Sequence, residues 1–433
     1  QAAVRMSSGS AQFAGGAGSK SGVIAESLAV GADGGAGNNS LIFTADSDQT
    51  VLSRASVVAS SGAVIGYGAS ITSAGSSANA EAFGALGGDQ NDIIRNAGSL
   101  SVLSDTGSTA RSVSFVLAGA STADLTANAE SEATGISGGE GFNDILNSGN
   151  LVVSANSRAV GSDATFVGAG VGSASRSGAD TVSRATAFGI IGGNNQDIIT
   201  NTGNIDVDAR AGSFIYNSAA AGGVWVNSQT NSHVFSFMTA KGIASGASEN
   251  DLVSNQGVIA VDLSSGAGNE RTRAESYSGY GSPISVNSDA GAYAVASMND
   301  LRAFGIEMGA GDGEIRNSGT VSVMMSTVAS SVAETNPNGL SGADGSSTPI
   351  VGVSGGLLSA IEAVGGGDKV VINDGSIIAI MSPRAGATSI ADADGVNIGS
   401  EPDAKSYSSI AMNNSRACGV DVGDGSGGVG SSG

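Results

Sequence analysis

The segment DIITNTGNID at residues 197–206 recurs as DIIRNAGSLS at residues 92–101, and this repetition decides the fold. In each copy an asparagine and a glycine stand two residues apart, with aliphatic residues at the other alternate positions. Alternate residues of a β-strand point to the same side. The pattern therefore predicts a strand in which Asn201 shares a face with Ile199 and Ile205. The asparagines of the six copies are Asn96, Asn147, Asn201, Asn255, Asn317 and Asn373.

A glycine that ends a short Ala-x-Gly segment precedes each of these copies. Looser copies at both ends of the chain extend this series to eight glycines, separated by 51 to 63 residues. A regular period of this size is typical of solenoids and repeat arrays. The eight anchor positions are Gly31, Gly84, Gly135, Gly189, Gly242, Gly305, Gly365 and Gly419.

The amino-acid composition favours an all-β solenoid over helical repeats, collagen and disorder. Helical repeats need leucine, glutamate and lysine at a spacing of 3.6 residues, whereas glycine, alanine, serine and valine alternate here. A chain with 69 glycines and only 5 prolines is neither collagen nor a proline-rich linker. Disorder is the competing interpretation of an acidic Gly/Ser-rich chain, yet 40% of the residues are hydrophobic and alternate in phase with the repeat. The prediction is a parallel β-helix of about eight repeats of roughly 54 residues.

In such a helix the asparagine–glycine phrase predicts a corner of the coil. Equivalent side chains of stacked coils lie about 4.8 Å apart, so inward asparagines can form a ladder of amide hydrogen bonds. The glycine two residues later permits a sharp corner at which φ can be positive. We therefore expect the six asparagines to have a structural and not a catalytic role.

The sequence alone does not determine whether each repeat makes one coil or two. A single coil of ~54 residues, at about 3.3 Å per residue, would have a perimeter near 180 Å. Two coils per repeat, only one of them with the asparagine corner, are therefore favoured. One broad coil with a long variable arm is the alternative. In the half of each repeat whose length differs between copies, the inward residues are small. They predict a thin, tightly packed cross-section.

The whole chain is predicted to be one β-solenoid domain over residues 1–433. It divides into a partial repeat at 1–30, repeats at 31–418 and a partial repeat at 419–433. An uncapped β-helix exposes a coil of unpaired backbone groups, and head-to-tail contacts of such ends generate filaments. We therefore expect the chain to be a subunit of a homopolymeric fibre or a segment of a longer repeat protein.

Charge and sequence features exclude several classes of partner. The formal net charge is −21, with 18 Lys and Arg against 39 Asp and Glu, and no basic patch is visible in the sequence. Nucleic acid and anionic membranes are therefore not expected as partners. No apolar run reaches the length of a membrane span, so no membrane insertion by this segment is expected. The single cysteine, Cys418, excludes an internal disulfide framework.

The pattern A-x-G-I…N-D-I-x-N-x-G-x-I-x-V resembles the repeats of bacterial autotransporter passengers and related large adhesins, over roughly residues 29–425. The resemblance implies a parallel β-helix, secretion, and exposure at or beyond the outer membrane. With the general preference for right-handed crossovers it predicts a right-handed coil. From the sequence we expect two departures from the family, namely no membrane barrel after the repeats and a longer period.

Acidic residues precede the asparagine corner in glycine-rich turns such as GGDQNDII (87–94) and GGNNQDII (192–199). Both resemble the calcium-binding nonapeptide of RTX repeats, without its third glycine and without direct tandem copies. A polar turn is one interpretation. Bound Ca²⁺ between neighbouring turns is the other, because hard oxygen ligands suit this cation. No cofactor is required by either interpretation. The candidate ligands are Asp89, Asp92, Glu140, Asp144, Asp197, Glu249 and Asp251.

No catalytic site is predicted. His233 is the only histidine, and no nucleophile motif lies near it. Cys418 and the single tryptophan, Trp225, are expected to be ordinary strand residues. The sequence thus favours a non-enzymatic structural or adhesive extracellular protein whose main partner is itself. The alternative is a passenger segment of a large adhesin that binds host or surface glycans.

Overall fold

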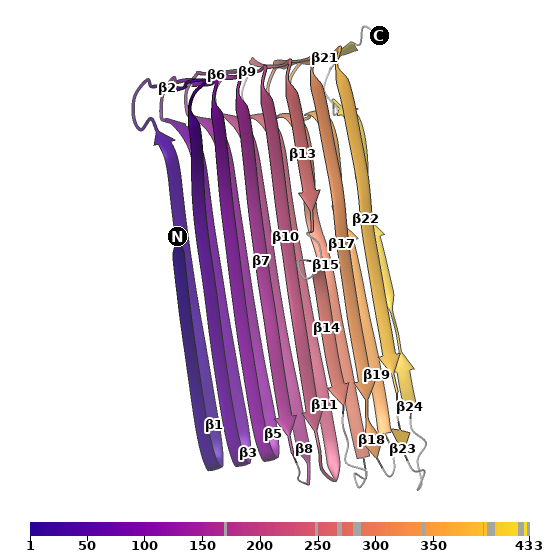
Figure 1. The fold of residues 1–433 in the computed structure, drawn as a ribbon. Coiled ribbons are helices and arrows are strands. Elements are labelled where there is room, and N and C mark those ends of the chain that lie inside the picture. Colours follow the sequence, from indigo (N-terminus) through magenta and orange to yellow (C-terminus); the bar gives the residue numbers. More distant parts are fainter. Residues whose placement is uncertain are drawn as a thin grey trace.

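The computed structural model describes residues 1–168, 171–246, 250–265, 271–279, 287–339, 343–392, 394–395, 403–422 and 428–430. In these residues the regular structure consists of β-strands in a 17-stranded, an 8-stranded and a 2-stranded sheet. Long strands lie side by side in sequence order, and the two termini lie at opposite ends of the stack (Figure 1). Equivalent strands of neighbouring coils pair in parallel. The chain is therefore an all-β parallel β-helix.

The long strands form the 17-stranded sheet, and in the later coils the same path is divided into shorter strands. They are β1 (Ala2–Asp33), β3 (Asp48–Gly88), β5 (Ser99–Gly139), β7 (Asn150–Val167), β8 (Ser173–Gly193), β10 (Asn204–Ala221), β11 (Trp225–Gly246), β13 (Val258–Ser264), β14 (Thr272–Gly279), β15 (Asn287–Met308), β17 (Thr320–Asn336), β19 (Ala343–Ser354), β20 (Leu357–Ala363), β22 (Ser376–Ala391), β24 (Asp403–Ser406), β25 (Ser409–Asn413) and β26 (Arg416–Asp421).

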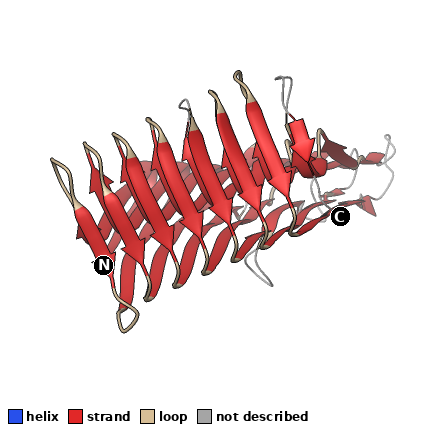
Figure 2. Ribbon diagram, turned by 90° about the horizontal axis from the view of Figure 1, so that it is seen from above, coloured by secondary structure: helices blue, strands red, loops and turns tan. Residues whose placement is uncertain are grey.

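The short strands form the narrow third side of the coil, which Figure 2 shows as a row of parallel arrows along the molecule. They are β2 (Ser40–Phe43), β4 (Ile93–Asn96), β6 (Asn143–Asn147), β9 (Asp197–Asn201), β12 (Asp251–Asn255), β16 (Gly313–Asn317), β21 (Lys369–Asn373) and β27 (Gly428–Gly430). The two-stranded sheet pairs β18 (Asn338–Gly339) with β23 (Asp394–Gly395).

Each repeat makes one coil. After β4 the chain runs out along the first half of β5, turns near Gly119, and returns along the second half to Gly139. We call these halves the outbound and the return leg. Ser99 pairs with Asp48 in the preceding coil and with Asn150 in the following one. The interpretation with two coils per repeat is therefore wrong, and the single broad coil is the structure.

So long a coil is filled because it is flattened. Its two legs pack face to face through small side chains, and hydroxyls from opposite legs hydrogen-bond across the interior. Ser76 Oγ lies 2.7 Å from Ser108 Oγ, and Thr72 Oγ1 lies 2.6 Å from Ser112 Oγ. Sheets packed through larger side chains lie about 10 Å apart, and serine pairs can only meet if they come closer. The expected thin cross-section is present.

The larger aliphatic residues collect beside the short strands, where three sides of the coil meet. Ile94, Ile145 and Ile199 are fully buried there, together with Leu151 and Ile190 from the long legs. This core continues from coil to coil along the stack. It fixes the position of the asparagine corner, because the asparagines follow the buried isoleucines on the same face of the short strands.

The helix is right-handed. In Figure 1 the outbound strands β13 and β14 lie in front with their arrowheads pointing down, and successive coils advance from left to right. A chain that runs down in front and up behind while it advances to the right describes a right-handed turn. This agrees with the hand expected for crossovers between parallel strands.

The corner glycines are required by close approach between coils. A Cβ on Gly149 would lie 2.0 Å from the carbonyl oxygen of Gly98, and one on Gly203 would lie 2.1 Å from that of Gly149. Neither glycine has a positive φ. The expectation that φ is positive at this corner is therefore wrong, and the absent side chain is what matters.

Six of the eight predicted anchor glycines also mark close approach; Gly365 is not at the anchor position, and a Cβ on Gly419 would meet nothing closer than 3.6 Å. A Cβ on Gly84 would lie 2.4 Å from the carbonyl oxygen of Gly135 in the next coil. Phe304 and Ile306 pair with Ser359 and Ile361, so the position equivalent to Gly305 is residue 360, an alanine. Gly365, predicted as the seventh anchor, instead lies in the following turn with φ 96°.

Candidate functional site: side-chain rows at the corner

The six predicted asparagines lie in one continuous row. The side-chain Nδ2 of each donates a hydrogen bond to Oδ1 of the asparagine in the next coil. The five donor–acceptor distances, from Asn96 to Asn373, are 2.8, 2.8, 2.8, 2.7 and 2.6 Å. The row begins at Asn96 because Phe43 occupies the equivalent position one coil earlier. Oδ1 of Asn96 accordingly has no hydrogen-bond partner among the described residues.

The backbone hydrogen bonds around this row run in the opposite direction, from the later coil to the earlier one. The N–H groups of Ser148 and Gly149 both donate to the Asn96 carbonyl oxygen, at 2.7 and 3.0 Å. The same two-to-one arrangement recurs at the later corners. Because the asparagines from Asn96 to Asn317 are buried, each unmade bond would leave a polar group without solvent, and the row specifies the stacking register.

A second buried row runs along the start of the short strands, and it was only half predicted. The side-chain Oδ1 of each member accepts the backbone N–H of its equivalent in the preceding coil. The distances are 2.7 Å from Asn39 to Asp92, 3.2 Å from Asp92 to Asn143, 3.0 Å from Asn143 to Asp197 and 2.9 Å from Asp197 to Asp251. Asparagine and aspartate serve equally here because only an acceptor oxygen is needed.

The glycine pairs before this row create the space for its side chains. A Cβ on Gly192 would lie 2.5 Å from Oδ2 of Asp197, and one on Gly87 would lie 2.6 Å from Oδ2 of Asp92. The second glycine of the pair has positive φ, 138° at Gly193. The resemblance of these turns to RTX nonapeptides therefore has a packing explanation that needs no metal.

The seven candidate calcium ligands do not converge. Asp92, Asp197 and Asp251 belong to the buried row, and only Asp197 and Asp251 are in neighbouring coils. Asp89 and Glu140 are exposed, and Asp144 forms an ion pair with Arg95. Glu249 lies outside the described residues. Within the described part of the chain no three His, Cys, Asp or Glu side chains are grouped so that they would hold a metal ion together. Calcium bound between Asp197 and Asp251 stays a prediction.

Burial changes the ionisation of several carboxyl groups. It raises the pKa of Asp197 to about 7, against the hydrogen bonds from Asn143, and the nearby Asp251 adds to the rise. Burial also raises the pKa of Asp163 to about 8, partly offset by its hydrogen bond from Ser177. Asp163 lies in the flat interior between the two legs and is fully buried. A proton can therefore replace a cation as the means of neutralising these groups.

The other singled-out residues lie on open faces or in the last coils. Nδ1 of His233 is 2.8 Å from Oδ1 of the exposed Asp180, and its ring packs edge-on against Tyr293. Trp225 is exposed beside the far turn. Cys418 is free and half-buried in β26. These positions form no common site.

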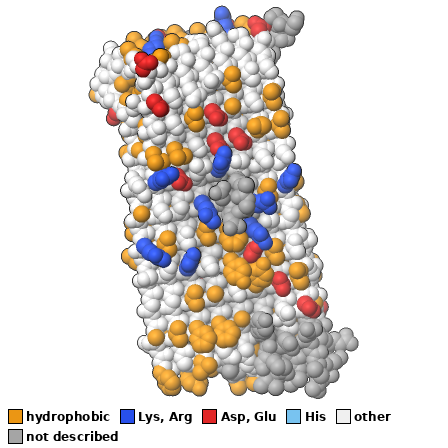
Figure 3. Space-filling view, viewed as in Figure 1, with side chains coloured by type: hydrophobic (Ala, Val, Ile, Leu, Met, Phe, Trp, Pro, Cys, Tyr) orange, Lys and Arg blue, Asp and Glu red, His pale blue; other side chains and the backbone are white. Residues whose placement is uncertain are grey.

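The structure shows a band of arginines on the outbound face, although no basic patch was predicted from the sequence. Arg54 and Arg210 lie in one row across β3 and β10, and Arg158 is two residues further along. Arg5 pairs with Val58 and Arg111 with Ser60. All five arginines are exposed, and Figure 3 shows basic side chains across the middle of this face. Only the coil register brings them together, so residue spacing alone does not reveal the band.

No protein-family model, curated protein or solved structure matches this chain. Among the residues that the structure describes there is no helix with the length and apolar character needed to cross a membrane.

Proposed function

We propose that the chain is a non-enzymatic structural element of an extracellular fibre or cell-surface layer, in which the stacked coils are themselves the functional product. The main support for this proposal is the unbroken row from Asn96 to Asn373, in which the amide Nδ2 of each coil donates a hydrogen bond to the amide Oδ1 of the next coil. Repetitive composition and the resemblance to adhesin repeats support the extracellular assignment.

The inward side chains of the first coil support stacking on a further coil. Val4 and Met6 face the interior, where their partners Val57 and Ala59 are buried, yet they are 42% and 47% exposed. A coil from a second copy, or from adjoining repeats of the same polypeptide, would cover them. In both cases the stack of coils becomes longer. Only a contact with a second copy predicts that the isolated chain polymerises.

Electron microscopy of the purified chain tests this proposal. We expect filaments, and we expect the double substitution Val4→Glu and Met6→Glu to shorten or abolish them, because the charges would enter the contact between coils. Substitution of the outward-facing Ala3 and Ser7 by glutamate on the same strand is the matched control and should leave filaments intact. A chain that stays monomeric at high concentration would contradict the fibre-subunit assignment.

The second candidate function is a passenger segment of a large adhesin that binds host or surface glycans. The open, polar outbound face, with its exposed arginines, favours this alternative as a surface on which an acidic glycan would lie. We call the Val4→Glu/Met6→Glu variant the end-blocked chain. Binding of its monomer to an acidic polysaccharide column would support the adhesin function. Retention by neutral polysaccharide alone would not.

A further inference from the structure

We propose that copies of this chain pack side by side, with the arginine band of one outbound face against a glutamate cluster on the return face of the next. The arginine band consists of Arg5, Arg54, Arg111, Arg158 and Arg210, and the glutamate cluster consists of Glu26, Glu81, Glu130 and Glu132. This lateral contact is separate from the end-to-end contact and goes beyond the proposed fibre.

The arginine band is concentrated within a short stretch of strand. Projected on β3, its members occupy the positions from Arg54 to Ser60, and the outward acidic residue in the same stretch of these strands is Asp105. Asp105 pairs with Arg54 at 3.4 Å, and Asp208 pairs with Arg210 at 2.5 Å. This leaves Arg5, Arg111 and Arg158 without an ion pair among the described residues. Such a band is unusual in a chain whose net charge is −21.

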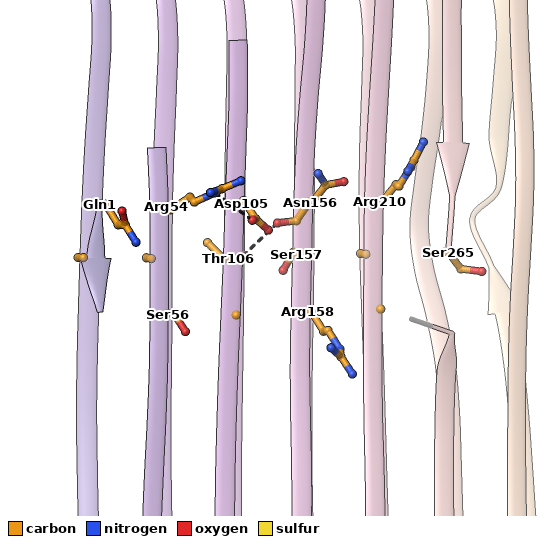
Figure 4. A pocket seen from close by; sticks show the side chains of 15 residues that line it. Gln1, Arg54, Ser56, Asp105, Thr106, Asn156, Ser157, Arg158, Arg210 and Ser265 are labelled. Atoms are coloured by element: carbon orange, nitrogen blue, oxygen red, sulfur yellow. Dashed lines mark hydrogen bonds and ion pairs between the residues drawn. The ribbon is translucent and has the colours of Figure 1, made fainter. Parts of the chain in front are cut away.

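A shallow hollow accompanies the band. Figure 4 shows Arg54, Asp105, Asn156 and Arg210 side by side on successive strands, with Arg158 below them. These residues line a hollow of about 430 Å³ in the face. The guanidinium fork of arginine binds carboxylates through two parallel hydrogen bonds, so the hollow suits protruding carboxylate side chains.

The glutamate cluster is a compact group of like charges. Glu26 and Glu130 lie in one row on either side of Asn79, and Glu81 pairs with Glu132 in the next outward row. Burial raises the pKa of Glu132, and the charges of Glu81 and Glu130 raise it further. Arg184 follows Glu130 in its row, but its guanidinium lies over the Phe237 ring at 4.8 Å. Among the described residues no glutamate of the cluster forms an ion pair, and Arg184 is the cation next to it.

The cluster lies back to back with the Arg54 end of the band. Ser104, next to Asp105 in the band, donates its hydroxyl to the Ala80 carbonyl beside Glu81, at 2.7 Å. Its Oγ also accepts a hydrogen bond from Ser131, which stands between Glu130 and Glu132, at 2.8 Å. A second copy displaced straight along the normal of the sheets would thus bring its glutamates over the Arg54–Arg210 row, and an additional shift along the strands would bring them over Arg158 and Arg5. Because the two surfaces differ, the contact repeats without closing and builds a layer.

Single-stranded nucleic acid fits the band less well. The aromatic rings beside it contact each other, with Phe115 stacked on Phe166 at 5.2 Å and Tyr216 tilted against Tyr277 at 5.3 Å, so one face of each ring is already occupied. The complementary surface on the same molecule, behind the Arg54 end of the band, favours a second copy over any other polyanion.

Sedimentation velocity in the Val4→Glu/Met6→Glu background tests the lateral contact without end-to-end assembly. We expect self-association at 20 mM salt that is lost at 500 mM, because salt screens exposed charges. The band variant Arg54→Glu/Arg158→Glu and the cluster variant Glu81→Arg/Glu130→Arg should each be monomeric. An equimolar mixture of the two should associate again, since each then offers a surface complementary to the other.

Arg95→Glu/Arg316→Glu is the matched control, because it changes the net charge equally but lies on the short-strand sheet, and it should still associate. A parent chain that is monomeric at 20 mM salt, or a mixture that fails to recover association, overturns the proposal. If the monomeric parent binds a heparin column and the band variant does not, the band belongs to an acidic polysaccharide instead.

Discussion

At the scale of single residues, the stacking of the coils depends on buried polar side chains whose partners come from neighbouring coils. An asparagine in the row both donates and accepts, so its loss affects two coils at once. An aspartate in the second row accepts one backbone N–H, and the remaining oxygen packs against glycine. Oδ2 of Asp92 and of Asp197 has no hydrogen-bond partner among the described residues. These carboxyl groups are tolerated because the glycine pairs leave space for them.

Asn147→Ala should strongly destabilise the chain. It leaves Nδ2 of Asn96 and Oδ1 of Asn201 buried without partners, at a cost of about 1–3 kcal/mol of unfolding free energy for each group. Chemical denaturation measures this loss. Asn150→Ala, on an exposed asparagine of the same repeat, is the control and should change the free energy by less than about 0.5 kcal/mol. Equal losses in the two variants would show that the row contributes nothing specific.

The calcium prediction concerns Asp197 and Asp251, the two neighbouring carboxylates of the second row. If Ca²⁺ binds only the folded state between them, millimolar Ca²⁺ raises the melting temperature above its value in chelator. Asp251→Asn should remove this difference while it keeps the acceptor oxygen for the Asp197 N–H. Identical melting temperatures of the parent chain in chelator and in calcium would rule the site out.

At the scale of elements, the corner between a short strand and an outbound leg depends on glycine. Gly149→Ala places a methyl group 2.0 Å from the Gly98 carbonyl oxygen, so the coils must separate or the corner must shift. Overpacking of this kind costs about 1–3 kcal/mol. Gly22→Ala is the control, because nothing lies within 4 Å of its Cβ, and it should be neutral or slightly stabilising. Denaturation that ranks the two variants the other way would contradict this reading of the corner.

The sequence was sufficient to predict the short strands, the asparagine row and the thin interior, because each depends on parity and on a motif that recurs at a fixed place. It was insufficient for the number of coils. A perimeter argument assumes a round, filled cross-section, whereas Ser76, Ser108 and their neighbours let the two legs nearly touch. The Asn39–Asp251 row was recognised only at its acidic positions, because its chemistry was taken as charge when only a hydrogen-bond acceptor is required.

At the scale of the whole molecule, acid should stabilise the fold. Burial raises the pKa of Asp163 to about 8, of Asp197 and Glu362 to about 7, and of Asp208 to about 6. The folded state thus binds more protons than the unfolded state between about pH 4 and pH 8. The stabilisation is fully present below the unfolded pKa values and is lost as the pH rises through the folded ones. The net charge of −21 adds repulsion in the same direction.

Thermal melting followed by circular dichroism checks this prediction. The melting temperature should be higher at pH 5 than at pH 8. Asp163→Asn should raise it at pH 8 and reduce the difference, because the amide carries no charge to bury. A melting temperature that increases steadily from pH 5 to pH 8 would show that these carboxyl groups do not govern the stability.

A spin-label distance between distant coils tests whether one repeat forms one coil. Asp48 and Ser376 are exposed and lie in equivalent positions six coils apart. Labels on Asp48→Cys and Ser376→Cys, in a Cys418→Ser background of the end-blocked chain, should lie about 29 Å apart at about 4.8 Å per coil. A distance near 58 Å, at the same ~4.8 Å spacing but with two coils per repeat, would contradict the account.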